Sequence, residues 1–243
     1  MSGHSHAKTI KHQKDIADAK RSAAFSKMAK ELEIAAKGGG DPVFNSKLRM
    51  AIERAKGVNM PTDNIERAIK RGTGELEGAK LEEVSFEAYG PGNVAIVIDG
   101  ITDNKNRTLG EIKQILNQNN GKLVGEGAIR WMFNRKGVLI VDLKSQNENF
   151  KNKENMDLAV IEAGADDIYW HDDMLDVYTK PEDLEKVRKN LEEKGVKTES
   201  VSLDWVPKEN MKIDESTKEA CQKLFEALDE NDSVQEIYSN LED

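Results

Sequence analysis

The chain has 243 residues, of which 33% are charged and 37% are apolar, with a formal net charge of −9 and one cysteine. This length accommodates two or three domains, and a single cysteine, Cys221, excludes an intramolecular disulfide. No stretch approaches the roughly 20 apolar residues that a membrane span needs, and the N-terminus lacks the apolar run of a signal peptide. We therefore expect a cytoplasmic protein with no membrane partner.

The charge is unevenly distributed along the chain. Residues 1–74 carry 15 Lys and Arg against 8 Asp and Glu, a balance of +7, whereas residues 75–243 carry 21 against 37, a balance of −16. A concentrated basic segment on an acidic protein is typical of one that holds a polyanion at one end, most often nucleic acid. The acidic remainder would repel that polyanion, so the basic segment would set the orientation of binding.

The basic segment has the pattern of three short helices. Between residues 13 and 37, apolar residues recur at helical spacing and lysines recur on a different arc. One face is therefore expected to pack while another presents a row of ammonium groups. Glycines at 38–40 end this helix, a second helix follows Pro42, and Pro61 suits the first turn of a third. Residues 72–80, rich in glycine and charge, have the composition of a linker.

The rest of the chain predicts strands mixed with helices. Alternating apolar residues predict a hairpin of strands at 84–88 and 93–98, a helix near 109–116 and a strand at 129–133. Residues 137–203 then follow the order β-α-β-β-α-β of the split βαβ, ferredoxin-like arrangement. In this stretch the strands are expected at 137–143, 167–170, 175–179 and 196–203, and the helices at 154–163 and 181–194.

A last helix at 215–228 and strand at 234–238 are expected to complete the preceding β-β-α-β domain. The prediction is an α+β fold, with an N-terminal three-helix domain followed by two ferredoxin-like α/β sandwich domains, the last inserted into the second. The expected domains are residues 1–78, residues 79–135 plus 204–243, and residues 136–203. Cys221 falls in the helical pattern and is expected to be a buried apolar residue.

The candidate nucleic-acid contacts are basic and lie mainly in the head. Lys and Arg release condensed counterions when they meet phosphates, which gives sequence-independent, salt-dependent affinity. The segment before the first helix has too little apolar content to order itself and would fold onto nucleic acid, unless it is an ordinary charged terminus. The predicted contacts are His4, Lys8, Lys11, His12, Lys14, Lys20, Arg21, Lys27, Lys30, Lys37, Lys47, Arg54, Arg67, Lys70, Arg71 and Arg107.

Two alternatives concern single sites. Arg107 precedes a helix N-terminus, where it could hold a phosphate, or Asp103 or Asn106 simply caps that helix. A metal could bind the N-terminal Ser-Gly-His, or His171 among the aspartates at 166–176. The latter spacing matches no defined site, so a solvated turn is favoured.

An enzyme is disfavoured, because the sequence has no P-loop, nucleophile elbow or zinc-ligand spacing. We therefore expect a non-enzymatic protein with no cofactor, no metal and no small-molecule substrate. Most tryptophans and tyrosines are expected in core or edge packing.

Several motifs, in the right order, resemble the YebC family, whose mitochondrial member is the translational activator of cytochrome c oxidase. The resemblance covers essentially the whole chain. One departure is His6-Ala7-Lys8, where members commonly have Lys-Trp-Ala. The motifs are GHSHAKTIKHQKDIADAKR (3–21), AAKGGGDP (35–42), LRMAIERAKGVNMP (48–61), IERAIKRGTG (65–74), YGPGNVAI (89–96), TDNKNRT (102–108) and VSLDWVP (201–207).

This resemblance implies a gene-expression factor with a helical head and two α/β domains around a cleft. Bacterial members were described as DNA-binding transcription regulators, and the family is also understood as ribosome-associated factors that assist translation through proline runs. We expect weak base specificity, which favours ribosomal RNA over a defined operator. The alternative is a DNA-binding transcriptional regulator that reads duplex DNA with the helix at 61–71. The acidic domains would face away from the polyanion or meet basic ribosomal proteins.

Overall fold

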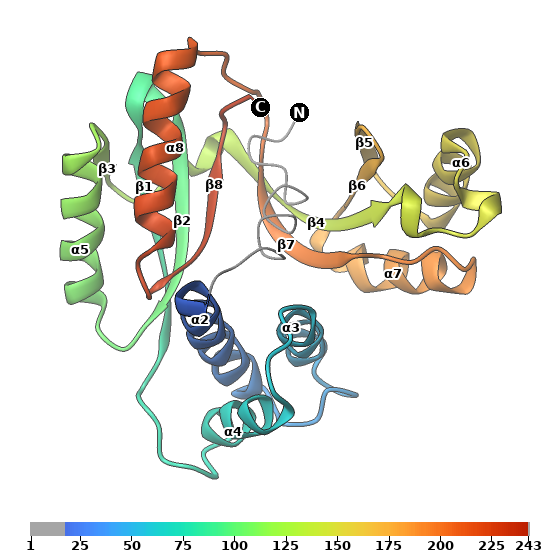
Figure 1. Cartoon of the computed structure of the whole chain (residues 1–243), viewed down its shortest axis with the longest axis horizontal. Coiled ribbons are helices and arrows are strands. Elements are labelled where there is room, and N and C mark those ends of the chain that lie inside the picture. Colours follow the sequence, from blue (N-terminus) through green and yellow to red (C-terminus); the bar gives the residue numbers. More distant parts are fainter. Residues whose placement is uncertain (1–17, 243) are drawn as a thin grey trace.

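The structure is a computed structural model that describes residues 18–242, with side chains from Arg21 onward. Within these residues, three helices come first, and two four-stranded antiparallel sheets with their helices follow (Figure 1). This arrangement confirms the predicted α+β class. Between residues 18 and 242, no helix is long and apolar enough to cross a membrane.

The three helices form the head, residues 18–72, which comprises α2 (Asp18–Ala36), α3 (Ser46–Gly57) and α4 (Thr62–Gly72). Its core is built from one apolar stripe of each helix, and Leu32, Leu48 and Ile65 are all buried there. Helices α2 and α4 lie so close that a Cβ on Gly72 would stand 2.3 Å from the Glu33 carbonyl oxygen. The three predicted helices of the head are thus present in the described residues.

The second unit is a sheet covered by two helices. It comprises β1 (Glu82–Tyr89), β2 (Ala95–Thr102), α5 (Lys105–Gln118), β3 (Lys122–Val124), α8 (Glu215–Asp229) and β8 (Val234–Ser239). The strand order is β3-β1-β2-β8, so the predicted hairpin forms the centre of the sheet. The last strand of the chain pairs with β2, as expected for a C-terminal segment that returns to this unit. Cys221 is fully buried in α8.

The third unit has the split βαβ order that the sequence predicts. It comprises β4 (Phe133–Asp142), α6 (Lys153–Ala163), β5 (Asp167–His171), β6 (Met174–Thr179), α7 (Leu184–Glu193) and β7 (Ser200–Pro207). The strand order is β5-β6-β4-β7, with β4 in the interior of the sheet. The second unit does not have this strand order, because its two central strands, β1 and β2, follow each other directly in the chain.

Three elements differ most from the sequence prediction, and one of them is β7, which begins at Ser200 and ends at Pro207 instead of spanning 196–203. The segment predicted as a strand at 129–133 is mostly a 3-10 turn, η2 (Arg130–Met132), and the third strand of the second unit is instead the short β3. Polar contacts explain the turn, since Glu87 accepts hydrogen bonds from the backbone nitrogens of Gly127, Ile129 and Arg130 and curls the segment around its carboxylate. The strand predicted at 137–143 begins earlier, at Phe133.

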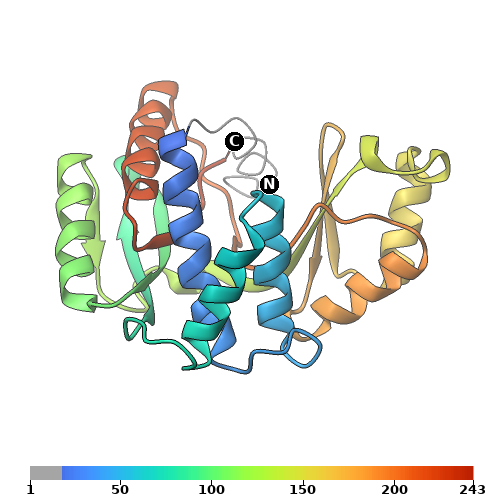
Figure 2. The same cartoon turned by 60° about the horizontal axis from the view of Figure 1, so that its bottom comes forward.

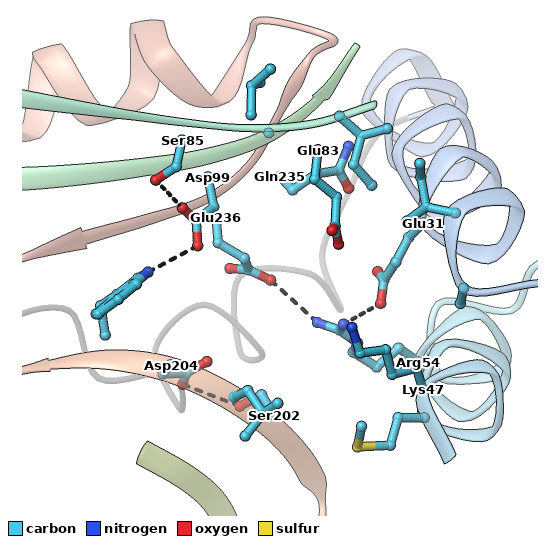
Figure 3. Close-up of a pocket in the computed structure, with 18 of the residues that line it drawn as sticks. Glu31, Lys47, Arg54, Glu83, Ser85, Asp99, Ser202, Asp204, Gln235 and Glu236 are labelled. Atoms are coloured by element: carbon cyan, nitrogen blue, oxygen red, sulfur yellow. Dashed lines mark hydrogen bonds and ion pairs between the residues drawn. The ribbon is translucent and has the colours of Figure 1, made fainter. Parts of the chain in front are cut away.

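A long strand pair connects the two α/β units. β4 and β7 pair continuously from Phe133↔Pro207 to Ile140↔Ser200, and both run across the expected boundaries near residues 135 and 203. The domain boundaries expected near residues 135 and 203 stay predictions. The head lies between the two units and faces both of them (Figure 2). The three parts line an open cleft of about 870 Å³ (Figure 3).

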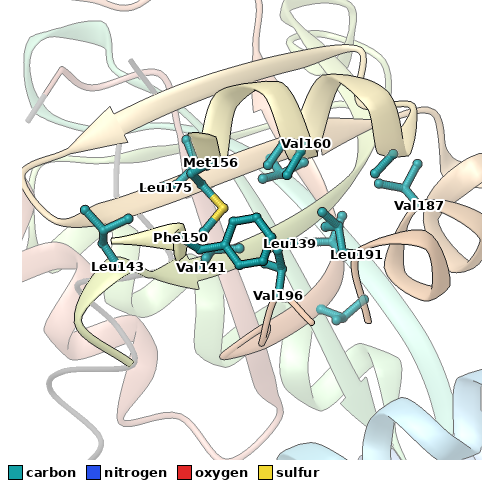
Figure 4. Packing of buried hydrophobic residues seen from close by; sticks show 14 of the residues in the cluster. Leu139, Val141, Leu143, Phe150, Met156, Val160, Leu175, Val187, Leu191 and Val196 are labelled. Carbon is teal, nitrogen blue, oxygen red and sulfur yellow. The ribbon is translucent and has the colours of Figure 1, made fainter. Parts of the chain in front are cut away.

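Each α/β unit has its own hydrophobic core. In the third unit, Leu139 and Val141 of β4 pack against Met156 and Val160 of α6, and Leu191 of α7 joins them (Figure 4). All five side chains are fully buried. Burial of apolar area stabilises the unit at about 25 cal/mol per Å², and nearly all of this core comes from the unit's own residues. The separate cores leave polar contacts to fix the head against the α/β units.

Candidate nucleic-acid interface

The lysine row predicted along the first helix consists of Lys20, Lys27, Lys30 and Lys37, and the last three of these contact the second unit or the start of β1. Lys27 Nζ lies 2.8 Å from Asp229 Oδ1 and 2.5 Å from the Asp229 carbonyl oxygen. Lys30 Nζ donates to the carbonyl oxygen of Asp232 at 2.7 Å. The expectation that this row is presented to solvent is therefore corrected for these two residues. The side chain of Lys20 lies outside the described residues.

The physical reason is the C-terminus of α8. The last carbonyl groups of a helix have no intrahelical partner and carry the negative end of the helix dipole, so they attract cations. Helix α8 ends at Asp229, and Lys27 supplies the cation there. Lys30, one turn further along α2, bonds the Asp232 carbonyl oxygen in the turn that follows α8. The Lys27 side chain is only 12% exposed as a result. A third lysine of the row, Lys37, donates to the Leu81 carbonyl oxygen at 2.5 Å, beside the start of β1.

Arg54 of α3 also turns inward, toward the cleft (Figure 3). Its guanidinium pairs with Glu31 of α2, and its Nη1 lies 3.4 Å from Glu236 Oε1 of β8. Burial lowers the pKa of Arg54, but the carboxylates of Glu31 and Glu236 outweigh that effect and leave it raised. The guanidinium is therefore a charged group that joins the head to the last strand.

Two more of the predicted arginines are held locally. Arg71 Nε lies 3.2 Å from Glu33 Oε2, and the Glu33 side chain is 8% exposed, so this pair ties α4 to α2. Arg107 pairs with Asp103 and lies 3.7 Å from Glu111. The Arg107 guanidinium lowers the pKa of the Asp103 carboxyl.

The helix cap beside Arg107 is neither of the two that the sequence suggested. Asn104 Oδ1 accepts a hydrogen bond from Arg107 N at 3.1 Å, which caps α5. The Arg107 side chain remains 52% exposed. A role in phosphate binding at this helix end stays a prediction.

The remaining predicted residues divide into two groups. Lys47 at the start of α3 and Arg67 and Lys70 on α4 are exposed, and so is Arg21, which has a contact of its own. The tail residues lie outside the described part of the chain, and their role stays a prediction. They are His4, Lys8, Lys11, His12 and Lys14.

The cleft contains a second basic cluster that the sequence did not single out. The guanidinium carbons of Arg130 and Arg135 lie 5.1 and 5.0 Å from the centroid of the Trp205 ring, within range for cation–π attraction. The Trp205 indole donates to Asp99 Oδ2 at 3.2 Å, and Arg135 Nη1 lies 3.4 Å from the same oxygen. Ser85 also donates to Asp99, at 2.6 Å (Figure 3). Each cation of this cluster thus has an acidic or aromatic neighbour within the cleft.

The turn before β4 displays a tryptophan. Glu87 is 2% exposed and accepts the backbone N–H groups of Gly127, Ile129 and Arg130 at 2.8 to 3.1 Å. Burial raises the pKa of Glu87, but these hydrogen bonds and the Arg130 charge outweigh it and leave it lowered. On this fixed turn Trp131 is 66% exposed, an exception to the expected packing role of the aromatic residues.

The metal alternative finds no support in the described residues. His171 Nε2 of β5 lies 3.1 Å from Asp176 Oδ2 of β6, an ordinary pair in the sheet of the third unit. Between residues 18 and 242, no group of three or more His, Cys, Asp or Glu side chains is placed to hold a metal ion. The N-terminal Ser-Gly-His lies outside this range.

Comparison with known proteins identifies the family. Residues 5–75 match the family description "TACO1/YebC protein N-terminal domain", and residues 81–241 match "TACO1/YebC second and third domain". The chain belongs to the TACO1/YebC family. These two matches agree with the resemblance that the sequence motifs suggested.

Full-length relatives have the same extent as this TACO1/YebC chain. A "Probable transcriptional regulatory protein" of Halothermothrix orenii is 49% identical over 244 residues, which span 100% of this chain and 95% of that protein. One of the same name from Natranaerobius thermophilus is 46% identical over 243 residues, spanning 100% and 96%. The crystal structure of a conserved hypothetical protein from Aquifex aeolicus superposes with a TM-score of 0.84 at 42% identity, covering 93% of this chain and 91% of that one.

The cleft cluster of this TACO1/YebC protein could have been found only in part from its sequence. Arg135 and Trp205 are direct cross-strand partners in the β4–β7 pair, a relationship that needs the register. The available signal was the placement of Arg135 just before the predicted strand at 137–143 and of Trp205 just after the one at 196–203. Arg130 lay inside a segment predicted as a strand, which concealed its position on a turn.

Proposed function

We propose that this protein is a non-enzymatic, nucleic-acid-binding regulator of gene expression, with ribosomal RNA as its target. In this proposal it acts in the cytoplasm as a ribosome-associated translation factor that helps synthesis through difficult sequences such as proline runs. The relatives' names support regulation of gene expression, and the basic head supports a polyanionic partner.

The observation that carries the preference for RNA is the turn between α2 and α3. Phe44 is 89% exposed there, and Val43 is 73% exposed. Exposed aromatic rings are the surfaces on which proteins stack unpaired bases, and unpaired bases are typical of RNA loops. Lys47, three residues beyond Phe44 in the first turn of α3, is exposed and can meet the adjoining phosphate.

Hydrogen bonds hold the backbone of this turn in place, although Val43 and Phe44 at its tip are exposed. Val43 N donates to Asp41 Oδ1 at 2.9 Å, and Asn45 N donates to the Asp41 carbonyl oxygen at 3.0 Å. The Asn45 side chain donates to the carbonyl oxygens of Ala35 and Gly39, both at 2.8 Å, and caps α3 through Leu48 N. A preorganised turn backbone loses little conformational freedom on binding, which favours affinity.

A second candidate function is DNA-binding transcriptional regulation, which the printed names of the relatives favour. The surface of α4, the candidate reading helix, supports it less well. Residues near the N-terminus of a recognition helix contact base edges, and here Asp63 and Glu66 are exposed near that end of α4. Carboxylates at this position would be repelled by the flanking phosphates. The basic residues, Arg67 and Lys70, lie further along the helix.

Sedimentation of tagged protein in cell lysate through a sucrose gradient, at low and high salt, tests the proposal. Co-migration with ribosomal particles at low salt and release at high salt would support ribosomal RNA as the target, since phosphate contacts weaken steeply with salt. Protein that stays at the top of the low-salt gradient, while the purified protein shifts a promoter fragment, would replace translation by transcription.

A further inference from the structure

Ion pairs fasten the head to both α/β units. Lys27 contacts Asp229 of the second unit, as described above, and Arg54 contacts Glu236. On the side of the third unit, Arg49 Nη2 of α3 lies 2.5 Å from Glu185 Oε2 of α7. In these three pairs the head supplies the cation and an α/β unit supplies the carboxylate.

A fourth pair has the opposite polarity. Arg188 Nη1 of α7 lies 3.2 Å from Glu53 Oε1 of α3, and Arg188 also lies 3.4 Å from Glu185 and from Glu192. Glu185 thus holds both Arg49 of the head and Arg188 of its own helix. The charge asymmetry that is visible in the sequence is, in the described residues, partly neutralised inside the molecule.

Apolar contact between the head and the α/β units is sparse. Among the described residues, Met50 is the head side chain that packs against the core cluster of an α/β unit, and most of the head's other apolar residues belong to its own cluster. The cleft separates the parts elsewhere. A polar interface of this kind permits relative motion of the domains it joins.

The connection between the head and the second unit also permits motion. Residues 73–80, which lead from α4 to β1, are all exposed and lie in neither a helix nor a strand. Gly74 in this segment has a φ of +82° and no atom within 4 Å of an added Cβ. Such a segment leaves the head able to move relative to the second unit once its contacts with that unit break, including the bonds from Lys30 to Asp232 and from Lys37 to Leu81.

We propose that these three cation–carboxylate pairs, Lys27–Asp229, Arg54–Glu236 and Arg49–Glu185, form an ionic latch that a nucleic-acid phosphate backbone opens. This inference rests on the proposed nucleic-acid function and adds its regulation. The tethered carboxylates act at a high effective concentration, so they compete with phosphates for the same cations. A polyanion that takes these cations releases the head from the α/β units and exposes the inner face of α2 and α3.

The latch also explains how the same lysine and arginine side chains can bind either the carboxylates of the α/β units or a phosphate backbone. Carboxylates and phosphates are both bound by Lys and Arg, but a polyanion also gains from counterion release, which isolated carboxylates do not provide. Each latch pair is partly exposed, with side-chain exposures of 12% and 72% for Lys27 and Asp229. Pairs of this kind are individually weak, so the latch can be opened by a multivalent ligand.

The test neutralises the carboxylates and keeps every cation. The latch variant is Asp229→Asn, Glu236→Gln and Glu185→Gln, and the matched control is Glu126→Gln, Glu199→Gln and Glu209→Gln, whose side chains are exposed. Both change the net charge equally, so general attraction to a polyanion rises equally. Circular dichroism checks that both variants fold. If the triple variant unfolds, the single variant Asp229→Asn replaces it, because that side chain is 72% exposed.

Two readouts are taken with a fluorescein-labelled RNA hairpin and a DNA duplex of the same sequence. One is affinity at low salt by anisotropy. The other, with unlabelled nucleic acid, is energy transfer between dyes on Thr62→Cys of the head and Glu219→Cys of α8. Native Cys221 is fully buried, and burial raises its pKa to about 11, so the dyes label the new cysteines.

We expect the latch variant to bind about tenfold more tightly than the control, with energy transfer already low before nucleic acid is added. In the control, energy transfer should fall when nucleic acid is added. If the control binds the hairpin or the duplex but the latch variant binds equally and energy transfer never changes, the latch is wrong and the proposed function stands. If the wild-type protein binds neither nucleic acid, the proposed function fails and the latch inference fails with it.

Discussion

Arg54 and Glu236 are 182 residues apart in sequence, yet the Arg54 guanidinium lies 3.4 Å from the Glu236 carboxylate. The contact joins the second helix of the head to the last strand of the chain. It gives a structural use to an arginine that its sequence context assigned to phosphate binding. The same guanidinium holds Glu31, so one cation separates two carboxylates that would otherwise repel each other.

Arg54→Ala should destabilise the protein by about 2 kcal/mol, because the remaining carboxylates of Glu31 and Glu236 lose their counter-charge in a partly buried site. The side-chain exposure of Arg54 is 31%, which keeps the expected loss below that of a fully buried pair. Urea unfolding at neutral pH measures it. The exposed Arg67→Ala on α4 is the matched control and should shift stability by no more than about 0.5 kcal/mol. Equal losses for the two variants would remove the structural role of Arg54.

Glu87→Gln should cost about 3 kcal/mol at neutral pH, because three backbone N–H groups lose a charged acceptor. The pKa of Glu87 is lowered in the folded protein from an ordinary value of 4.5. Its contribution to stability is therefore fully present above pH 4.5 and is lost as pH falls through the folded pKa. The difference in unfolding free energy between wild type and variant should be constant near neutral pH and shrink below pH 4. A difference that grows in acid would contradict this assignment.

The secondary structure follows closely from local patterns in the sequence. Alternation of apolar residues at 84–88 and 93–98 predicted the hairpin of β1 and β2, and the pattern at 154–163 predicted α6. These signals are local, because side-chain periodicity reports which face of a strand or helix is buried. The 3-10 turn of η2 was missed because its cause is Glu87, more than 40 residues earlier in the chain.

The orientation of the head could not be predicted, for the same physical reason. Periodicity placed Lys27 and Lys30 on an arc away from the apolar stripe, and the structure agrees that they do not pack in the head core. The groups that face this arc are the carbonyl oxygens of Asp229 and Asp232, at and just after the C-terminus of α8, about 200 residues later in the chain. A charge pattern indicates that a partner is anionic, but it does not tell an internal carbonyl or carboxylate from an external phosphate.

Gly72→Ala should destabilise the head by more than about 2 kcal/mol, because its Cβ would stand 2.3 Å from the Glu33 carbonyl oxygen and 2.7 Å from Ala36 Cβ. The neighbours are backbone and a short side chain, so only separation of α2 from α4 relieves the overlap. Gly110→Ala, on the exposed face of α5 with no atom within 4 Å, is the control and should stabilise by about 0.5–1 kcal/mol. Thermal unfolding of both variants measures the contrast, and a stable Gly72→Ala protein would mean that the two helices can separate freely.

Phe44→Ala should leave stability within about 0.5 kcal/mol of wild type, because the ring is 89% exposed and buries almost no area. It should nevertheless weaken binding to an RNA with an unpaired loop by about 1–3 kcal/mol, the contribution of one base stacked on an aromatic ring. Phe44→Trp should restore binding, whereas Phe44→Leu, which keeps apolar area without an aromatic face, should not. Fluorescence anisotropy with looped RNA and a fully paired duplex distinguishes the cases. Equal affinities for Phe44→Leu and wild type would mean that the turn meets an apolar protein surface instead of a base.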